Sequence, residues 1–309
     1  MPPPSLRIGT RGSPLALWQA RHVRDRLIEE HGLSDGDIEL STITTSGDRI
    51  ADKPLRDFGG KGLFTKEIDE ALLSGAVDLA VHSMKDLPTV LPEGVVIAAV
   101  LPRADVRDAF ISTKAPSLAE LPPGSVVGTS SLRRAAQVRR LRPDLRVADL
   151  RGNVETRLRK LKEGAADATL LAMAGLMRLG LAAQATSILS TDEMLPAVAQ
   201  GAIGVAARSD DERTRALLAK LNDAYSAKGV ACERAFLARL DGSCKTPIAG
   251  LAEIDDGVVR FRGLILTPDG TEWHGIELTG EAEHARALGT DAGEELLARA
   301  GRDFLAKLA

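Results

Sequence analysis

Short apolar runs alternate with helix-like stretches along the first two-thirds of the chain. Apolar runs bounded by turn residues predict strands, whereas apolar residues spaced three and four apart predict helices. Strands are expected at Leu6–Gly9, Ile38–Ile43, Val77–His82, Val95–Val100, Asp108–Ser112, Ser125–Thr129, Leu145–Asp149 and Asp167–Ala172, and helices at about 14–30, 64–73, 131–141 and 153–163. This alternation predicts α/β domains with mainly parallel sheets.

The pattern starts twice. The letters IGT before Arg11 resemble VGT before Ser130, and each leads from a strand into a helix. The segments GAVDLAVHSMKDL (75–87) and GAADATLLAMAGL (164–176) share Gly, Ala, Asp, Met and Leu at the same offsets. We therefore expect two similar α/β lobes with a cleft between them, where ligands collect at the carboxyl ends of strands and beside helix N-termini.

The last third has a different pattern. A helix is expected over Asp223–Leu240, followed by the small-residue loop GSCKTP at 242–247. Two apolar stretches, Val258–Leu266 and Thr271–Leu278, flank a turn sequence and predict a hairpin, with closing helices over Glu281–Leu308. This favours a small α+β third domain. The expected domains are 1–102 with 196–222 for the first, 103–195 for the second, and 223–309 for the third.

Composition is that of an ordinary globular protein, with 309 residues, 44% hydrophobic and 27% charged. The N-terminal letters lack a signal-peptide pattern, and no apolar run approaches the roughly 20 residues of a membrane span. Two cysteines, Cys232 and Cys244, cannot form a disulfide framework, and zinc-type ligand clusters are absent from the sequence. We expect a cytoplasmic protein without a metal.

Charge is concentrated in one segment. Residues 131–160 carry net +7, although the whole chain carries −3. Arginine offers a planar fork that matches a carboxylate or phosphate, so a local cluster predicts a site for a polyanionic small molecule. A nucleic-acid partner would call for a wider basic face and more aromatic residues than 3%. The arginines at strand-to-helix turns are expected to face the cleft: Arg11, Arg133, Arg134, Arg151 and Arg157. The others are expected to be solvated: Arg139, Arg140, Arg142 and Arg159.

Two further side chains could carry chemistry. Asp86 follows a strand in VHSMKDLP, where it is either a turn residue before Pro88 or a general acid and counter-charge for a cation. Cys244 lies beside Lys245, whose charge can lower a thiol pKa, although a lone cysteine is more often inert. Cys232 is expected in the core, and His82 is expected to pack without a catalytic role.

Long motifs over the whole chain are similar to those of the porphobilinogen deaminase (hydroxymethylbilane synthase) family. They are TRGSPLALWQA (10–20), GGKGLFTKE (59–67), AVHSMKDLP (80–88), GTSSLRRAAQ (128–137), LRGNVETRL (150–158), AGLMRLG (174–180), LPAVAQGA (195–202) and the GSCKTPI loop (242–248).

The resemblance implies a transferase of tetrapyrrole biosynthesis, such as that of haem. It would join four porphobilinogen molecules head to tail into 1-hydroxymethylbilane and release four ammonia. The implied fold has two lobes like periplasmic binding proteins and a third domain, in a monomer. Cys244 would carry a covalent dipyrromethane cofactor, and Asp86 would be the catalytic acid.

The resemblance also implies a set of ligand contacts. Cofactor-binding positions would be Lys85, Ser83, Thr129, Ser130, Ser131, Arg133, Arg134, Arg151 and Gly152. Substrate-binding positions would be Arg11, Ser13, Arg157, Arg178, Gln200, Lys61 and Phe64.

Three other interpretations compete with this one. A two-lobed anion-binding protein without catalysis would have no use for the cysteine loop and usually carries an export signal. A cysteine-nucleophile acyl transferase would want a histidine base beside Cys244, and no histidine obviously serves that loop. A nucleic-acid binder conflicts with the acidic balance outside residues 131–160.

Overall fold

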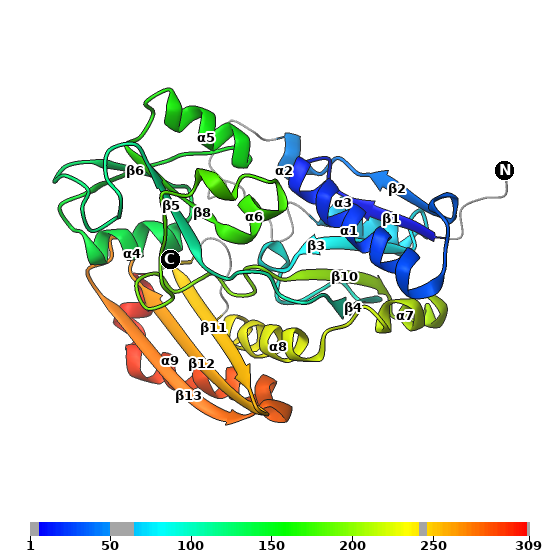
Figure 1. The fold of residues 1–309 in the computed structure, drawn as a ribbon. Helices are drawn as coiled ribbons and strands as arrows, with labels where there is room; N and C mark the ends of the chain where they lie inside the picture. The colour runs from blue at the N-terminus through cyan, green and yellow to red at the C-terminus, as the bar shows by residue number, and fades with distance from the viewer. Residues whose placement is uncertain (1–5, 50–64, 241–245, 308–309) are drawn as a thin grey trace. The chain divides into compact units, whose positions relative to one another are not determined.

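The computed structural model describes residues 6–49, 65–240 and 246–307 (Figure 1). The chain divides into two compact units, residues 1–104 with 202–227, and residues 105–201 with 228–309. The first unit holds one five-stranded sheet, and the second holds a five-stranded and a three-stranded sheet.

The sheet of the first unit has the strand order β2-β1-β3-β10-β4. Its strands are β1 (Leu6–Thr10), β2 (Ile38–Thr42), β3 (Leu79–Ser83), β4 (Val95–Val100) and β10 (Ile203–Arg208). Its helices are α1 (Pro14–His31), the short α2 (Ser46–Arg49), α3 (Lys66–Leu73) and α7 (Glu212–Ala219). Helices α1 and α7 share one core cluster with the sheet, and α3 shares another, so the sheet is covered on both faces.

The five-stranded sheet of the second unit has the order β7-β6-β8-β5-β9. Its strands are β5 (Asp108–Ser112), β6 (Val126–Gly128), β7 (Arg146–Ala148), β8 (Ala168–Ala172) and β9 (Ser187–Ile188). Its helices are α4 (Leu132–Leu141), α5 (Val154–Lys162) and α6 (Met173–Arg178). Val138 of α4 packs in one core cluster, whereas Leu158 of α5 and Leu176 of α6 pack in another.

The two five-stranded sheets have the same strand topology. In each, the first strand lies between the second and the third, and an antiparallel strand follows the third. An aspartate one residue before the third strand repeats as well: Asp78 accepts a hydrogen bond from the backbone N–H of Arg7, and Asp167 accepts one from that of Val126. The predicted repeat is confirmed in this geometry, and so is the α/β fold class.

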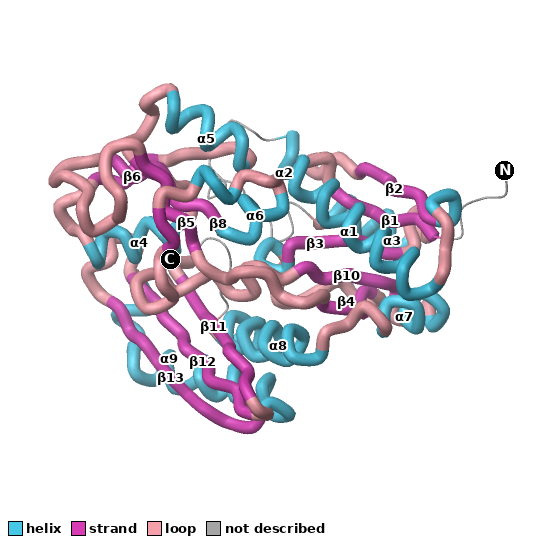
Figure 2. The backbone as a smooth tube through the Cα atoms, viewed as in Figure 1, coloured by secondary structure: helices cyan, strands magenta, loops and turns pink. Residues whose placement is uncertain are grey.

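The expectation of mainly parallel sheets needs one correction in each sheet, where one strand runs against its two neighbours. Strand β10 runs antiparallel to β3 and β4, and β5 runs antiparallel to β8 and β9. Figure 2 shows β10 between β3 and β4. Strand β10 lies about 120 residues after β3 in the sequence. No helical crossover joins β3 or β4 directly to β10. The rule that a βαβ crossover connects parallel strands therefore does not fix the direction of β10.

The three-stranded antiparallel sheet comprises β11 (Ile248–Asp255), β12 (Val258–Leu266) and β13 (Trp273–Glu281). It carries α9 (Ala285–Ala306), which contacts β12 and β13. Phe236 of α8 (Ala224–Arg239) packs against Phe261 of β12, with tilted rings whose centroids are 4.8 Å apart. Strand β11 was not expected, but the hairpin and the α+β character are confirmed.

Candidate functional site

Two strand ends bring the acidic candidate into a pocket of the first unit. Strands β1 and β3 are parallel neighbours, so Arg11 after β1 and Ser83 at the end of β3 reach the same sheet edge. Ser13 caps α1, because its hydroxyl accepts the backbone N–H of Ala16 at 3.3 Å. The pocket is lined by Arg11, Ser13, Leu15, Ala16, Gln19, Thr65, Val81, His82, Ser83, Asp86 and Leu87.

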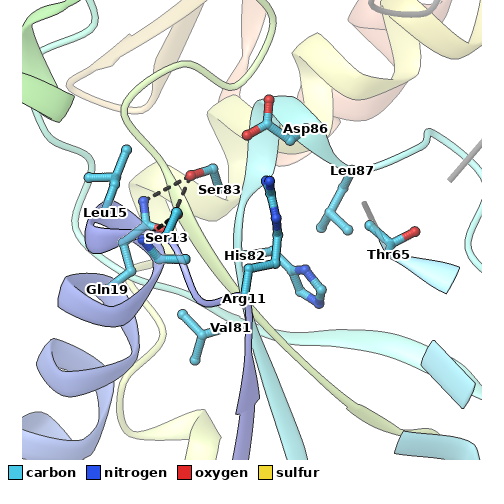
Figure 3. Close-up of a pocket in the computed structure, with 11 residues that line it drawn as sticks. Arg11, Ser13, Leu15, Gln19, Thr65, Val81, His82, Ser83, Asp86 and Leu87 are labelled. Atoms are coloured by element: carbon cyan, nitrogen blue, oxygen red, sulfur yellow. Dashed lines mark hydrogen bonds between the residues drawn. The ribbon is translucent and has the colours of Figure 1, made fainter. Parts of the chain in front are cut away.

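Asp86 ends the one-turn helix η3 (Met84–Asp86) that follows β3, and its carboxylate is exposed at the pocket. The side chain of Arg11 extends toward Asp86 (Figure 3). Gln19 of α1 fixes the hydroxyl of Ser83: Nε2 donates to Oγ at 2.8 Å, and Oγ donates back to Oε1 at 3.2 Å. A pocket with an acid, a cation and oriented neutral donors can bind a substrate that carries both an amine and carboxylates.

His82 lines the same pocket but is buried. Burial, together with the smaller effect of the nearby charge of Arg11, lowers the pKa of His82 to about 4. The ring is therefore neutral near pH 7, and its Nε2 has no partner among the described residues. A neutral imidazole with so low a pKa is a poor base at that pH, which agrees with the packing role expected for it.

The matching edge of the second unit carries hydroxyls between β6 and α4. Ser131 caps α4 by accepting the N–H of Arg134, and Thr129 Oγ1 accepts the N–H of Ser131 at 3.2 Å. Ser130 donates to the carbonyl of Leu150 at 2.8 Å. These three residues therefore form a structured turn at a helix N-terminus, where the dipole favours anions.

A second turn at this edge follows β7. Arg151 pairs with Asp149 at 2.5 Å, and Arg157 Nε donates to the carbonyl of Gly152 at 2.8 Å. Gly152 has φ +118°, and a Cβ there would come within 2.5 Å of Thr156, so only glycine fits. Arg151 and Arg157 are half-buried. The turn thus adds two cations to the polar edge.

Arg133 and Arg134 do not lie on an open surface. Both are buried at 5% exposure, and both bind the carboxylate of Asp108, which is completely buried. Gln200 joins them by donating to Asp108 Oδ1 at 2.9 Å. The structure thus brings three predicted ligand residues together around an aspartate that sequence reasoning missed. Their contacts with a ligand stay a prediction.

The other predicted positions are more scattered. Arg178 donates to the carbonyl of Gly201 at 2.7 Å, and burial lowers its pKa to about 10. Lys85 is half-buried beside Asp86 in η3. Three of the predicted positions, Lys61, Phe64 and Cys244, lie outside the described residues.

Two of the arginines expected to be solvated are structural instead. Arg142 donates to three backbone carbonyls between 118 and 121, and Arg139 donates to that of Pro268 at 2.7 Å. Arg140 is exposed but lies 3.9 Å from the ring centroid of Trp273. Arg159 is exposed and pairs with Glu163, as a solvated arginine would. Sequence alone cannot tell a solvated arginine from one that caps carbonyls of a distant loop.

Cys232 is buried in α8, and burial together with the charge of Glu233 raises its pKa to about 12. It is inert as a nucleophile, which confirms the core role expected for it. Within 6–49, 65–240 and 246–307 no cluster of three His, Cys, Asp or Glu side chains could hold a metal ion. None of the helices described in those ranges has the length and hydropathy to cross a bilayer.

Comparisons with known proteins identify the family. Residues 6–216 match the family model "Porphobilinogen deaminase, dipyromethane cofactor binding domain", and residues 227–298 match "Porphobilinogen deaminase, C-terminal domain". Porphobilinogen deaminase of Paracoccus denitrificans is 58% identical over 98% of each chain. The chloroplastic enzyme of Oryza sativa is 57% identical over 98% of this chain and 86% of its own.

Among solved structures, a periplasmic substrate-binding protein of an ABC transporter from Coxiella burnetii is similar at 16% identity, with a TM-score of 0.43. That match covers 70% of this chain and 91% of the other. The family models and the identity over nearly the full length decide the assignment: the chain belongs to the porphobilinogen deaminase family.

Proposed function

We propose that the chain is a porphobilinogen deaminase that works with Asp86 as its catalytic acid. It joins four porphobilinogen molecules head to tail into 1-hydroxymethylbilane and releases four ammonia, a step of tetrapyrrole biosynthesis. The observation that carries the proposal is the pocket that places Asp86 at one sheet edge with Arg11 and Ser83, in a chain of this family.

Asp86 acts on the aminomethyl group of the incoming substrate. Loss of that group as ammonia requires a proton on nitrogen and leaves a cation delocalised over the pyrrole ring. An exposed carboxylate can hold the ammonium by a hydrogen bond and then stand as counter-charge to the cation. Stabilisation of a developing charge by a fixed group is usually the largest electrostatic contribution to catalysis.

The dipyrromethane cofactor supplies a primer to which new pyrrole units are added. Each of its pyrrole rings carries two carboxylates, so it requires several cationic donors. The second unit provides them as Arg133, Arg134, Arg151 and Arg157, with donor N–H groups at the starts of α4 and α5. Arg133 Nε is buried and has no partner among the described residues, so the donor set fits an anionic group.

Cys244 is the proposed attachment point of the cofactor. Cys232, with its raised pKa and complete burial, is unsuited to that role. The remaining proposals are substrate contacts from Ser13, Arg178, Gln200, Lys61 and Phe64 and cofactor contacts from Lys85, Thr129, Ser130, Ser131 and Gly152. We further propose a cytoplasmic monomer with domains 1–102 with 196–222, 103–195 and 223–309.

The test is turnover of porphobilinogen by the holoenzyme and by Asp86→Asn, which keeps the size of the side chain but removes its charge. We expect a loss in kcat of about 10²–10⁴-fold. The variant should still carry the cofactor adduct, as seen by intact mass. Asp25→Asn is the control, because Asp25 is an exposed carboxylate of the same unit and pairs with its neighbour Arg24. Full activity in Asp86→Asn would contradict the role, and an anion-binding protein without turnover would then be the better account.

A further inference from the structure

Asp108 is the common acceptor of a buried cluster in the second unit. Its Oδ1 accepts from Arg134 Nη2 at 2.7 Å and from Gln200 Nε2 at 2.9 Å. Its Oδ2 accepts from Arg133 Nη2 at 2.8 Å and from Arg134 Nε at 3.2 Å. A carboxylate with four donors and no exposure is fully satisfied.

The cluster ties two other segments to this carboxylate. Arg133 Nη1 donates to the carbonyl of Leu195 at 2.8 Å. Gln200 Nε2 also donates to the carbonyl of Val106 at 2.7 Å. Asp108 thereby fixes the start of α4, which carries both arginines, against the segment 195–200 that carries Gln200.

The charges of the cluster do not cancel. Burial raises the pKa of Asp108, but the charges of Arg133 and Arg134 outweigh this and hold it well below its usual range. One carboxylate therefore faces two guanidinium groups, and one positive charge is left in a buried place. A buried unpaired charge is costly, so this cluster favours a further anion.

Donors remain for such an anion. Arg134 uses Nε and Nη2 on Asp108, and its Nη1 makes no hydrogen bond to a described residue. Arg133 Nε is buried and likewise has no partner in the part of the chain that the structure describes. Asp108 occupies one side of the two guanidinium groups and leaves Arg134 Nη1 for a ligand.

We propose that Asp108 is a positioning residue for cofactor loading. It holds Arg133, Arg134 and Gln200 in one orientation and sets their cluster to a single positive charge that receives a carboxylate of the dipyrromethane cofactor. This rests on the proposed function, because the ligand is the cofactor of that activity.

The experiment compares loading of apoprotein by porphobilinogen in wild type, Asp108→Asn and Asp108→Glu. Apoprotein is made in cells that cannot form porphobilinogen, and the adduct is followed by intact mass. Asp167→Asn is the matched control: Asp167 also pairs with a cation, Lys114, but at the opposite end of β8. Loss of either aspartate should lower the Tm, whereas only loss of Asp108 should slow loading.

We expect loading by Asp108→Asn to be roughly tenfold slower or worse, about 1.4 kcal/mol, because the two guanidinium groups lose the acceptor that orients them toward the cofactor. Inorganic sulfate should also compete at lower concentration in this variant, because its cluster carries a second positive charge. A purely structural role would lower the Tm without changing the sulfate dependence. If Asp108→Asn does not fold, Asp108→Glu decides, because it keeps the charge but shifts both guanidinium groups, and it should load several-fold more slowly.

Loading of the folded variants at the wild-type rate, with unchanged sulfate dependence, overturns the proposal. Equal slowing in Asp167→Asn overturns it as well, because the effect would then follow stability. If the wild-type protein acquires no adduct, the proposed function itself is contradicted. This result comes from the wild-type protein alone and does not depend on the Asp108 variants.

Discussion

Gln19 Nε2 donates to Ser83 Oγ at 2.8 Å across the pocket that holds Asp86. The two residues are 64 positions apart, on α1 and at the end of β3. Gln19 is buried at 1% exposure, so its amide cannot move without losing this bond. The pair therefore fixes the hydroxyl of Ser83 at the edge of the pocket.

Replacement of Gln19 tests this relationship. In Gln19→Ala the hydroxyl of Ser83 loses its partner and becomes free to rotate. We therefore expect kcat/KM for porphobilinogen to fall about five- to tenfold, which corresponds to one hydrogen bond of about 1–1.4 kcal/mol. Gln184→Ala on the exposed 3₁₀ helix Ala182–Gln184 serves as control. Unchanged steady-state kinetics in Gln19→Ala would show that turnover does not depend on the orientation of the Ser83 hydroxyl by Gln19.

His82 predicts a pH dependence of stability. Its pKa is lowered from 6.5 to about 4 in the folded protein, mainly by burial. As the pH falls, His82 therefore takes up a proton in the unfolded chain before it does so in the folded chain. The free energy of unfolding falls as pH drops from about 6.5 to 4. The difference of about 2.5 pH units corresponds to about 3 kcal/mol. Above pH 6.5 this contribution is constant.

Urea unfolding between pH 4 and 7 measures it. We expect the free energy of unfolding to depend less steeply on pH in His82→Gln than in wild type. The control His284→Gln changes a ring that is 75% exposed and should keep the wild-type slope. The same slope in wild type and His82→Gln would mean that His82 takes up its proton at the same pH in the folded and the unfolded chain.

Gly270 predicts a steric requirement at the tip of the β12–β13 hairpin. Its φ is +75°, and a Cβ would lie 2.5 Å from the carbonyl of Ala136 and 2.9 Å from the N of Arg140, both on α4. Gly257 has nearly the same φ, +76°, but a Cβ there meets nothing within 4 Å. Gly257→Ala should therefore cost only the backbone strain of about 1 kcal/mol.

We expect Gly270→Ala to lower the free energy of unfolding by about 2–4 kcal/mol, because overpacking adds to the same strain. Thermal unfolding of the two variants side by side separates the contributions. Equal Tm values would show that the hairpin tip moves away from α4 without penalty.

Most strands and helices follow from the sequence, because their boundaries coincide with local signals. Pro14 begins α1, and Ser131 and Asn153 cap α4 and α5. Strand β10 was not predicted, because the apolar letters IGVAAR include Gly204, whose missing side chain makes room for Met84. That fit depends on a residue 120 positions away in the sequence, and no local pattern encodes it.

The candidate site is predictable only to the same degree. Asp86 and Arg11 were candidates because both follow strand ends, where ligands gather in α/β sheets. The catalytic role predicted for Asp86 came from the family resemblance. Asp108 was missed, although β5 was predicted with its observed bounds. Its role depends on Arg134 and Gln200, which lie 26 and 92 positions away. A charged residue at the start of an apolar strand indicates a buried ion pair, but the sequence does not show which residues are its partners.

The central claim is that this chain builds its product on a primer attached to one cysteine. The most direct test is the intact mass of the purified protein, followed by peptide mapping of any adduct. The account predicts an excess of two linked porphobilinogen-derived pyrroles on the peptide that contains Cys244, with Cys232 unmodified because it is buried. An unmodified mass from cells that make tetrapyrroles, with no adduct after incubation with porphobilinogen, would contradict it.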